Sequence, residues 1–304
     1  MKCYISDVEI NLIGLNEKEK NFLQKTLKIS PQKTKNKMIF KFGEKFNLVN
    51  SLKSVKLNAA IYNTVGDKCY VKQFNGDKAI WNFRDNEYIF CNKFIYKNLR
   101  NWFFANILDP FSIGCINYDK IIIHGSLWKY KEKGIIVCGN SGSGKSTLSL
   151  LLKNYVRVLS DDVLVLSKKN NIFYVEPINV GYGIHKNLFD EFDLTEKQKK
   201  EVLAENDKKI YIKQIYDDYI CEEIELNKII ILKKNSARKT TIETGSDYDN
   251  LLSFINLQTN IPNPLFFKKY QLIKSIINNV NITNIKYSDI CDVKKLKQVI
   301  TGEL

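Results

Sequence analysis

Short apolar stretches alternate with polar turns over the first hundred residues, a pattern typical of half-buried strands. These stretches lie at residues 3–5, 38–42, 59–62, 69–71 and 79–81. Asn75-Gly76-Asp77 favours a tight hairpin between the last two stretches, because Asn and Gly tolerate a positive φ. The pattern predicts a small antiparallel β domain within residues 1–108.

Residues 92–109 carry apolar side chains at helical spacing, and Pro110 predicts the end of a helix that bridges two domains. From residue 120 the pattern changes to continuous apolar runs, which are typical of strands buried on both faces of a sheet. The runs lie at 121–123, 135–138, 163–166, 173–175 and 229–232. Helices are predicted at 148–155, 195–205 with Thr195 as N-cap, 270–277 and 293–300. The prediction is therefore a second, α/β domain over residues 109–304.

Composition adds a basic charge to this picture. The 304 residues are 44% hydrophobic, enough for a core, and the formal net charge is +14. Almost all of the positive charge is Lys, with Arg only at positions 84, 100, 157 and 238. The guanidinium groups that read guanine edges are therefore scarce, and nucleic acid is not the expected partner. An acidic peptide or a phosphorylated partner fits the same charge.

The compartment is predicted from what the sequence lacks. No apolar run approaches the length of a membrane-spanning helix, and the N-terminus has no apolar signal region, so a cytoplasmic protein without a membrane partner is expected. The seven cysteines are scattered and form no C-x-x-C pair. Reduced thiols, and not a zinc site, are the expected state.

One motif carries strong chemical information, because it fits G-x-x-x-x-G-K-[ST] and lies between an apolar run and a predicted helix. Its residues are Gly139-Asn140-Ser141-Gly142-Ser143-Gly144-Lys145-Ser146, followed by Thr147. Glycines let successive N–H groups converge on phosphate at the start of a helix. Lys145 is expected to reach the β/γ oxygens, and Ser146 to offer its hydroxyl to Mg²⁺. ATP and Mg²⁺ are therefore the expected ligands.

Two adjacent carboxylates, Asp161 and Asp162, stand between Ser160 and the apolar run at 163–166. If Asp161 serves the metal, Asp162 is placed to accept the proton of an incoming alcohol, since crowding beside a dication makes the two ionise differently. The structural alternative is a pair that caps a turn. His124-Gly125 precedes the loop at the end of the run at 121–123. A lone His is more often structural than functional, so His124 is a candidate only.

These motifs together resemble the catalytic domain of the HPr kinase/phosphorylase family. The resemblance rests on His124-Gly125-Ser126-Leu127, the loop Gly139 to Ser146 and Arg157-Val158-Leu159-Ser160-Asp161-Asp162, and covers roughly residues 115–235. It implies a P-loop kinase core of the HPr kinase and phosphoenolpyruvate carboxykinase type. It also implies that His124 and Asp162 flank the γ-phosphate and the acceptor hydroxyl, with Asp162 as base and Asp161 with Ser146 near the metal. The broader group is similar to kinases that act on a precursor peptide or on free serine.

The chain departs from that family at two places. Thr147 stands where the family has Glu, and the later Glu-Ile-Arg-Gly stretch has no counterpart, so phosphorylase activity and the HPr substrate stay open. Residues 176–185 take its position, and their Gly and Pro content predicts a mobile loop over the site. Within it, Glu176 is a candidate for metal or acceptor binding, and His185 is expected to face solvent. Lys208 and Lys209 either meet phosphate oxygens or form a solvated pair.

The function expected from the sequence is an ATP- and Mg²⁺-dependent kinase for a Ser or Thr hydroxyl of a peptide or small protein. The N-terminal domain is expected to help recognise the acceptor. Two alternatives stay open: a small-molecule kinase acting on a free serine-like alcohol, and a non-catalytic ATP-binding regulatory module. HPr kinases assemble into rings, and whether this chain forms a homo-oligomer is left open.

Overall fold

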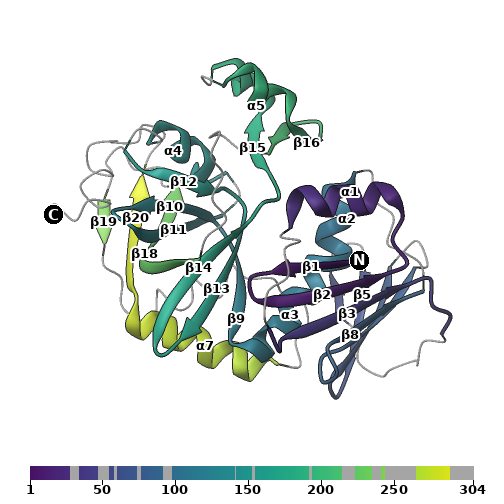
Figure 1. The fold of residues 1–304 in the computed structure, drawn as a ribbon. Coiled ribbons are helices and arrows are strands. Elements are labelled where there is room, and N and C mark those ends of the chain that lie inside the picture. Colours follow the sequence, from purple (N-terminus) through teal and green to yellow (C-terminus); the bar gives the residue numbers. More distant parts are fainter. Residues whose placement is uncertain are drawn as a thin grey trace. The chain divides into compact units, whose positions relative to one another are not determined.

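The computed structural model describes residues 1–27, 34–46, 55–57, 60–73, 77–91, 98–140, 142–152, 155–191, 194–213, 223–234, 241–243 and 265–287. Within this mixed α/β chain, two compact units separate: residues 1–121 with 259–270, and residues 122–258 with 271–304. The boundaries fall inside strand β9 (Lys120–His124) and helix α7 (Phe266–Asn279), which Figure 1 labels.

Eight strands of the first unit's described residues form one sheet, in the order β1-β2-β3-β8-β7-β6-β5-β4. The strands and the first helix are β1 (Lys2–Ile5), β2 (Val8–Ile13), α1 (Glu17–Thr26), β3 (Lys37–Phe42), β4 (Val55–Leu57), β5 (Ala60–Val65), β6 (Lys68–Gln73), β7 (Lys78–Asn82) and β8 (Glu87–Phe90). Helical segments follow: α2 (Leu99–Phe103), the π-helix η1 (Phe104–Leu108), α3 (Asp109–Gly114) and the 3-10 helix η2 (Cys115–Tyr118).

The prediction of a purely antiparallel sheet is wrong for this unit. Strand β3 pairs in parallel with both β2 and β8, and α1 supplies the crossover that parallel neighbours require. The sequence does carry a signal for α1, the capping box in which Asn16 and Glu19 exchange hydrogen bonds. The hairpin prediction at 75–77 falls mostly outside the described residues, although β6 and β7 on either side pair antiparallel.

The sequence predicted that the helical region ends at Pro110, but in the structure it continues beyond that residue. Segments α2, η1 and α3 follow one another without a break from Leu99 to Gly114. In the π-helical turn the Asp109 N–H bonds to the Phe104 carbonyl, five residues back. Pro110 then sits in the first turn of α3, where its missing N–H costs little. These segments belong to the first unit, and the predicted residues 92–97 lie outside the described chain.

The second unit contains a larger mixed sheet and a smaller one. The large sheet runs β12-β10-β11-β18-β14-β13-β9, with β20 also beside β18 and β19 beside β20; the small sheet is β15-β17-β16. Its elements are β10 (Ser126–Tyr130), β11 (Lys133–Gly139), α4 (Lys145–Leu151), β12 (Arg157–Ser160), β13 (Val163–Lys169), β14 (Ile172–Ile178), β15 (Tyr182–His185), the 3-10 helix η3 (Lys186–Glu191), α5 (Glu196–Lys200), β16 (Val202–Glu205), β17 (Lys209–Ile212), β18 (Ile224–Lys234), β19 (Thr241–Glu243) and β20 (Asn281–Tyr287).

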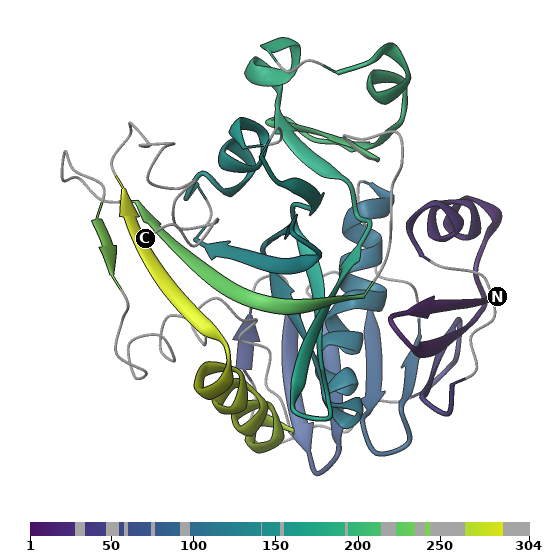
Figure 2. The ribbon, with the colours of Figure 1, turned by 60° about the vertical axis from the view of Figure 1, so that its left-hand side comes forward.

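An apolar cluster holds helix α4 against both sheets of this unit. Leu148 and Leu152 pack with Ile230 of β18 and with Tyr182 and Ile184 of β15, all of them buried. Strand β18 pairs in parallel with β11 and β20, and helix α7 leads directly into β20, as Figure 2 shows. The helix that begins at the glycine-rich loop is therefore fixed by the core of the unit.

Two predictions in this unit need correction. Residues 195–205 are not one helix, because α5 ends at Lys200 and β16 pairs with β17; the Thr195 N-cap is confirmed. Residues 176–185 are not a loop either, since strands β14 and β15 occupy all but 179–181. Helix α7 confirms the prediction at 270–277, and the one at 293–300 lies outside the described residues. No helix in the described ranges is long and apolar enough to cross a membrane.

Candidate active site

The glycine-rich loop joins the end of β11, at Gly139, to the start of α4, at Lys145. Gly142 and Gly144 both have φ +79°, in the left-handed region that side chains disfavour. A Cβ on Gly139 would lie 2.8 Å from the Leu232 carbonyl oxygen of β18. The loop therefore needs glycine at these positions, either for its turns or for the close approach of a neighbouring strand.

Hydrogen bonds inside the loop set its path into the helix. The Ser143 N–H donates to the Asn140 carbonyl at 3.0 Å, and the Gly144 carbonyl accepts the Leu148 N–H at 2.9 Å. The Ser143 hydroxyl oxygen is buried and has no hydrogen-bond partner in the described chain. Ser141, predicted to belong to the nucleotide site, lies outside the described residues.

Lys145 is 7% exposed, and its ammonium folds back onto the loop. It donates to the carbonyl oxygens of Gly139, at 2.8 Å, and of Asn140, at 3.3 Å. Burial lowers the pKa of Lys145 from its ordinary value, and the nearby charge of Asp161 opposes that effect. The cation is thus held by neutral oxygens that an anionic ligand could replace.

Asp161 is buried and joined to two serines. The Ser126 hydroxyl donates to its Oδ1 at 2.7 Å, and the Ser146 side chain hydrogen-bonds to the same carboxyl group. Burial raises the pKa of Asp161, while these hydrogen bonds and the charges of Lys209 and Lys145 act to lower it. The structure thus brings together Ser146 and Asp161, the two residues predicted to serve the metal.

Asp162 belongs to a different environment, shared with His124. The His124 Nδ1 lies 2.8 Å from Asp162 Oδ1, with side-chain exposures of 52% and 15%. The Gly125 N–H donates to the Asp162 carbonyl at 3.0 Å, and a Cβ on Gly125 would lie 2.8 Å from the Val137 carbonyl oxygen. The His-Gly pair is therefore tied to Asp162 through side chain and main chain, with a proton assigned to Nδ1 between the two groups.

The donor set fits a magnesium ion only in part. Within the described residues, no three His, Cys, Asp or Glu side chains gather to hold a metal. The Ser146 hydroxyl and the Asp161 carboxylate are oxygen ligands, which Mg²⁺ prefers, and Mg²⁺ commonly completes its shell with water and substrate phosphates. These two residues fit a magnesium ion whose coordination shell is completed by phosphate oxygens and water. Thr147, beside them on α4, is exposed.

Two residues near the site were missed or left undecided by sequence reasoning. The sequence did not predict Ser126 as a partner of Asp161, because no sequence rule links residues this far apart. Lys209 now separates from Lys208: the charge of Lys209 acts on the pKa of both Lys145 and Asp161, whereas Lys208 is exposed.

Two further candidates occupy positions on strands. Glu176 is buried on β14, opposite Val165 of β13. His185 is exposed at the end of β15, as expected for a solvent-facing residue, although it lies on a strand and not on a loop.

Comparison with known proteins adds one similarity. No family model matches the chain, and no curated protein matches it. Among solved structures, it is similar to the HPr(Ser) kinase/phosphatase from Coxiella burnetii, at 15% sequence identity and a TM-score of 0.32. The match covers 60% of this chain and 95% of that chain. At these values, the function of the chain has to be inferred from its own residues.

Proposed function

We propose that this chain is an ATP-dependent kinase that transfers the γ-phosphoryl group to a Ser or Thr hydroxyl of a peptide or small protein. One observation carries the proposal: two adjacent carboxylates beside a glycine-rich loop have different partners. Asp161 is buried against Ser126 and Ser146, whereas Asp162 pairs with His124. Paired acids whose surroundings differ are suited to different roles in one reaction.

ATP binding is supported by the loop and by Lys145. Strand β11 delivers the loop to the N-terminus of α4, where backbone N–H groups and the helix dipole favour phosphate. Phosphate oxygens would replace the Gly139 and Asn140 carbonyls as partners of the Lys145 ammonium. The buried Ser143 hydroxyl offers a further donor. Asn140 and Thr147 stay assigned to this site as part of the proposal.

Ser146 and Asp161 would hold Mg²⁺, which when bound screens the charge of the β- and γ-phosphates. The residues themselves have a simpler task, which is to keep two oxygens side by side. Ser126 supports that task, because its hydroxyl already occupies Oδ1 of Asp161 at 2.7 Å and so limits rotation of the carboxylate.

Asp162 is the proposed general base. Its carboxylate accepts the proton of the acceptor hydroxyl as the oxygen forms a bond to the γ-phosphorus and the bond to the β-phosphate oxygen breaks, releasing ADP. His124 donates from Nδ1 to Oδ1 of Asp162, which orients the carboxylate that accepts the proton. The exposure of His124 supports access by a large acceptor.

The acceptor class follows from charge and from that access. A net charge of +14 attracts acidic segments, and the exposed His124 beside Asp162 suits a hydroxyl carried on a peptide more than a small alcohol in a closed pocket. In this proposal the first unit, with its eight-stranded sheet, contributes acceptor recognition.

A transfer assay tests the proposal. The protein is incubated with γ-labelled ATP and Mg²⁺ against three acceptors: a Ser-containing acidic peptide library, a phosphocarrier protein of the HPr type and free serine. Mass spectrometry should detect one added phosphate on a peptide or protein hydroxyl, and Lys145→Ala should lower its rate of formation by about 10³-fold. Phosphate on free serine alone would show that the acceptor is a small alcohol and not a peptide or protein. ATP binding with no transfer to any acceptor would overturn the kinase assignment in favour of a regulatory module.

A further inference from the structure

The last residue of β20, Tyr287, lies against the glycine-rich loop. Its ring is buried in the apolar cluster around α4, at 6% exposure. Its hydroxyl donates a hydrogen bond to the Ser143 carbonyl, and a Cβ added to Gly144 would clash with the same oxygen. Tyr287 therefore contacts the loop directly, although it follows Ser143 by 144 residues in the sequence. Sequence reasoning did not single it out.

The bond acts on one peptide group, the one that joins Ser143 to Gly144. In a trans peptide the C=O and N–H point in opposite directions, and the described chain contains no cis peptide. Holding the Ser143 oxygen toward Tyr287 therefore turns the Gly144 N–H to the opposite side. That N–H has no hydrogen-bond partner among the described residues, so it is available as a donor to an anion.

Gly144 is fixed from its other side as well. Its carbonyl accepts the Leu148 N–H in the first turn of α4, and its φ of +79° is one that other residues rarely adopt. The Tyr287 hydroxyl thus completes a set of restraints on a single loop residue. Preorganised backbone donors bind phosphate without the cost of ordering them at the moment of binding.

The geometry points to Tyr287 as a positioning residue of the nucleotide site, one whose hydroxyl aims the Gly144 N–H at the phosphates of ATP. This inference rests on the proposed function, because it requires that the loop binds a nucleotide. It assigns Tyr287 no contact with the nucleotide and no part in proton transfer. Its effect is expected on affinity for ATP, and much less on turnover once ATP is saturating.

Tyr287→Phe tests the inference, because it removes the hydroxyl and keeps the ring in its apolar cluster. Isothermal titration with ATP and Mg²⁺ should give a Kd about tenfold higher than that of the wild type, the effect of losing one hydrogen bond. The KM for ATP should rise similarly, with kcat within about twofold. Tyr182→Phe is the matched control, since it removes another buried hydroxyl from the same cluster, and its Kd should match that of the wild type.

A second pair of variants keeps the test independent of that single change. Gly144→Ala should weaken ATP binding, and it should do so less in the Tyr287→Phe background, where the oxygen that meets the new Cβ is gone. An unchanged Kd in Tyr287→Phe, or strictly additive effects in the double variant, would overturn the inference while ATP binding by the wild type stood. Failure of the wild-type protein to bind ATP would overturn the proposed function and this inference together.

Discussion

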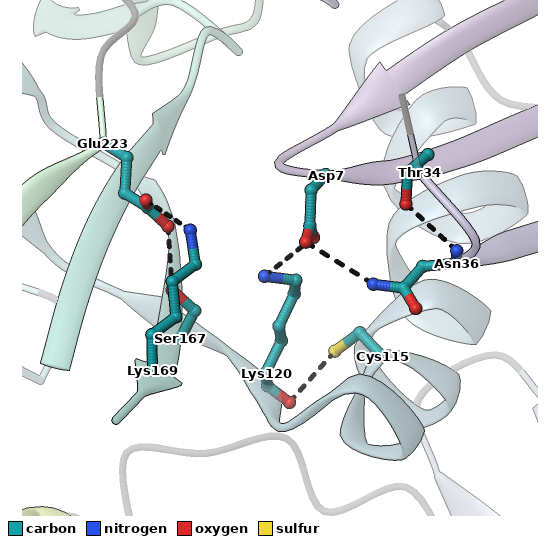
Figure 3. A network of polar contacts seen from close by, with 8 residues as sticks. All are labelled: Asp7, Thr34, Asn36, Cys115, Lys120, Ser167, Lys169 and Glu223. Atoms are coloured by element: carbon teal, nitrogen blue, oxygen red, sulfur yellow. Dashed lines mark hydrogen bonds and ion pairs between the residues drawn. The ribbon is translucent and has the colours of Figure 1, made fainter. Parts of the chain in front are cut away.

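The two units each bury a lysine, and the two lysines have different partners. Lys120, in the first unit, is 2% exposed and lies 2.9 Å from the Asp7 carboxylate (Figure 3). Lys145, in the second unit, is 7% exposed and donates only to main-chain carbonyls among the described residues. A carboxylate neutralises its cation, whereas a carbonyl satisfies the donor and leaves the charge available for an anion. The partner of the ammonium, and not its burial, therefore separates a structural lysine from one that can bind an anion.

The surroundings of Lys120 support that distinction. Asn36 lies 3.5 Å from the second Asp7 oxygen, and the Lys120 carbonyl accepts the Cys115 thiol at 3.4 Å, so the residue is anchored at both ends (Figure 3). The same figure shows Glu223 of the second unit paired with Lys169 at 2.5 Å and accepting from Ser167 at 3.0 Å. Paired charges of this kind hold strands together and leave no charge for a ligand.

The largest effect is expected from Lys145→Ala. Loss of a preorganised cation at the phosphates should lower phosphoryl transfer by about 10³-fold, because no other described residue replaces it in the loop. Thermal unfolding should change little, since the lysine makes no ion pair within 4 Å in the described chain. The matched variant is Lys120→Met, which keeps the apolar stem and should leave transfer unchanged. Equal losses of transfer in the two variants would remove the distinction between the lysines.

A smaller loss of transfer is expected from Asp162→Asn. The amide keeps the shape of the carboxylate but cannot accept the proton, so kcat should fall by about 10²-fold, in line with general-base catalysis, while the Kd for ATP holds. Steady-state kinetics and titration with ATP measure the two quantities separately. Full turnover in this variant would show that the base is another group.

Sequence reasoning reached the site by way of local patterns and failed where contacts are distant. The loop from Gly139 to Ser146 is flanked by a strand and a helix as predicted, because glycine content and apolar runs are local signals. The link from Ser126 to Asp161 depends on the β10-β12 pairing, which no local pattern reveals. The role of Tyr287 depends on β20 lying beside β18, a contact with residues far earlier in the chain.

The fold was predictable to a similar extent. Apolar runs predicted β11 and β13, but the hairpin between β10 and β11 turns at Lys131 and Glu132, both with positive φ, where the sequence offers no Gly or Asn. Residues 202–205 sit in a charged context that favours helix locally, and pairing with β17 overrides that preference. Tertiary pairing therefore decided the elements that were missed.

Asp7→Ala should lower the unfolding free energy of the protein. It leaves a buried ammonium at Lys120 without its carboxylate, and a stranded charge is costly. Because the Asp7 side chain is 43% exposed, solvent reduces the cost to about 2 kcal/mol of unfolding free energy, less than for a fully buried pair. Urea unfolding measures it. The double variant Asp7→Ala with Lys120→Met should recover most of the loss, and no recovery would mean that the ion pair is not the cause.

A second lysine, Lys209, is expected to contribute to ATP binding. Its charge acts on both Lys145 and Asp161, so Lys209→Ala should raise the KM for ATP by about tenfold, a typical effect of one charge-assisted hydrogen bond to phosphate. Lys208→Ala removes the neighbouring exposed charge and is the matched control, with the KM expected to stay within about twofold. Equal effects of the two variants on the KM would indicate that Lys208 and Lys209 form a solvated pair, the alternative that the sequence left open.

The smallest effect concerns a partly buried carboxyl group of the first unit, Asp109, in the first turn of α3. Burial raises its pKa from 3.8 to about 7, so the folded state holds a proton that the unfolded state has already lost at neutral pH. Its contribution to stability is present at low pH and is lost as the pH rises through about 7. Between pH 6 and 8 the wild type should lose about 1.4 kcal/mol of unfolding free energy relative to Asp109→Asn. Urea unfolding followed by the fluorescence of Trp81 and Trp102 measures the difference, with Asp67→Asn as an exposed control. The Asn side chain does not titrate. If the difference in unfolding free energy between the wild type and Asp109→Asn stays constant from pH 6 to pH 8, the titrating group is not Asp109.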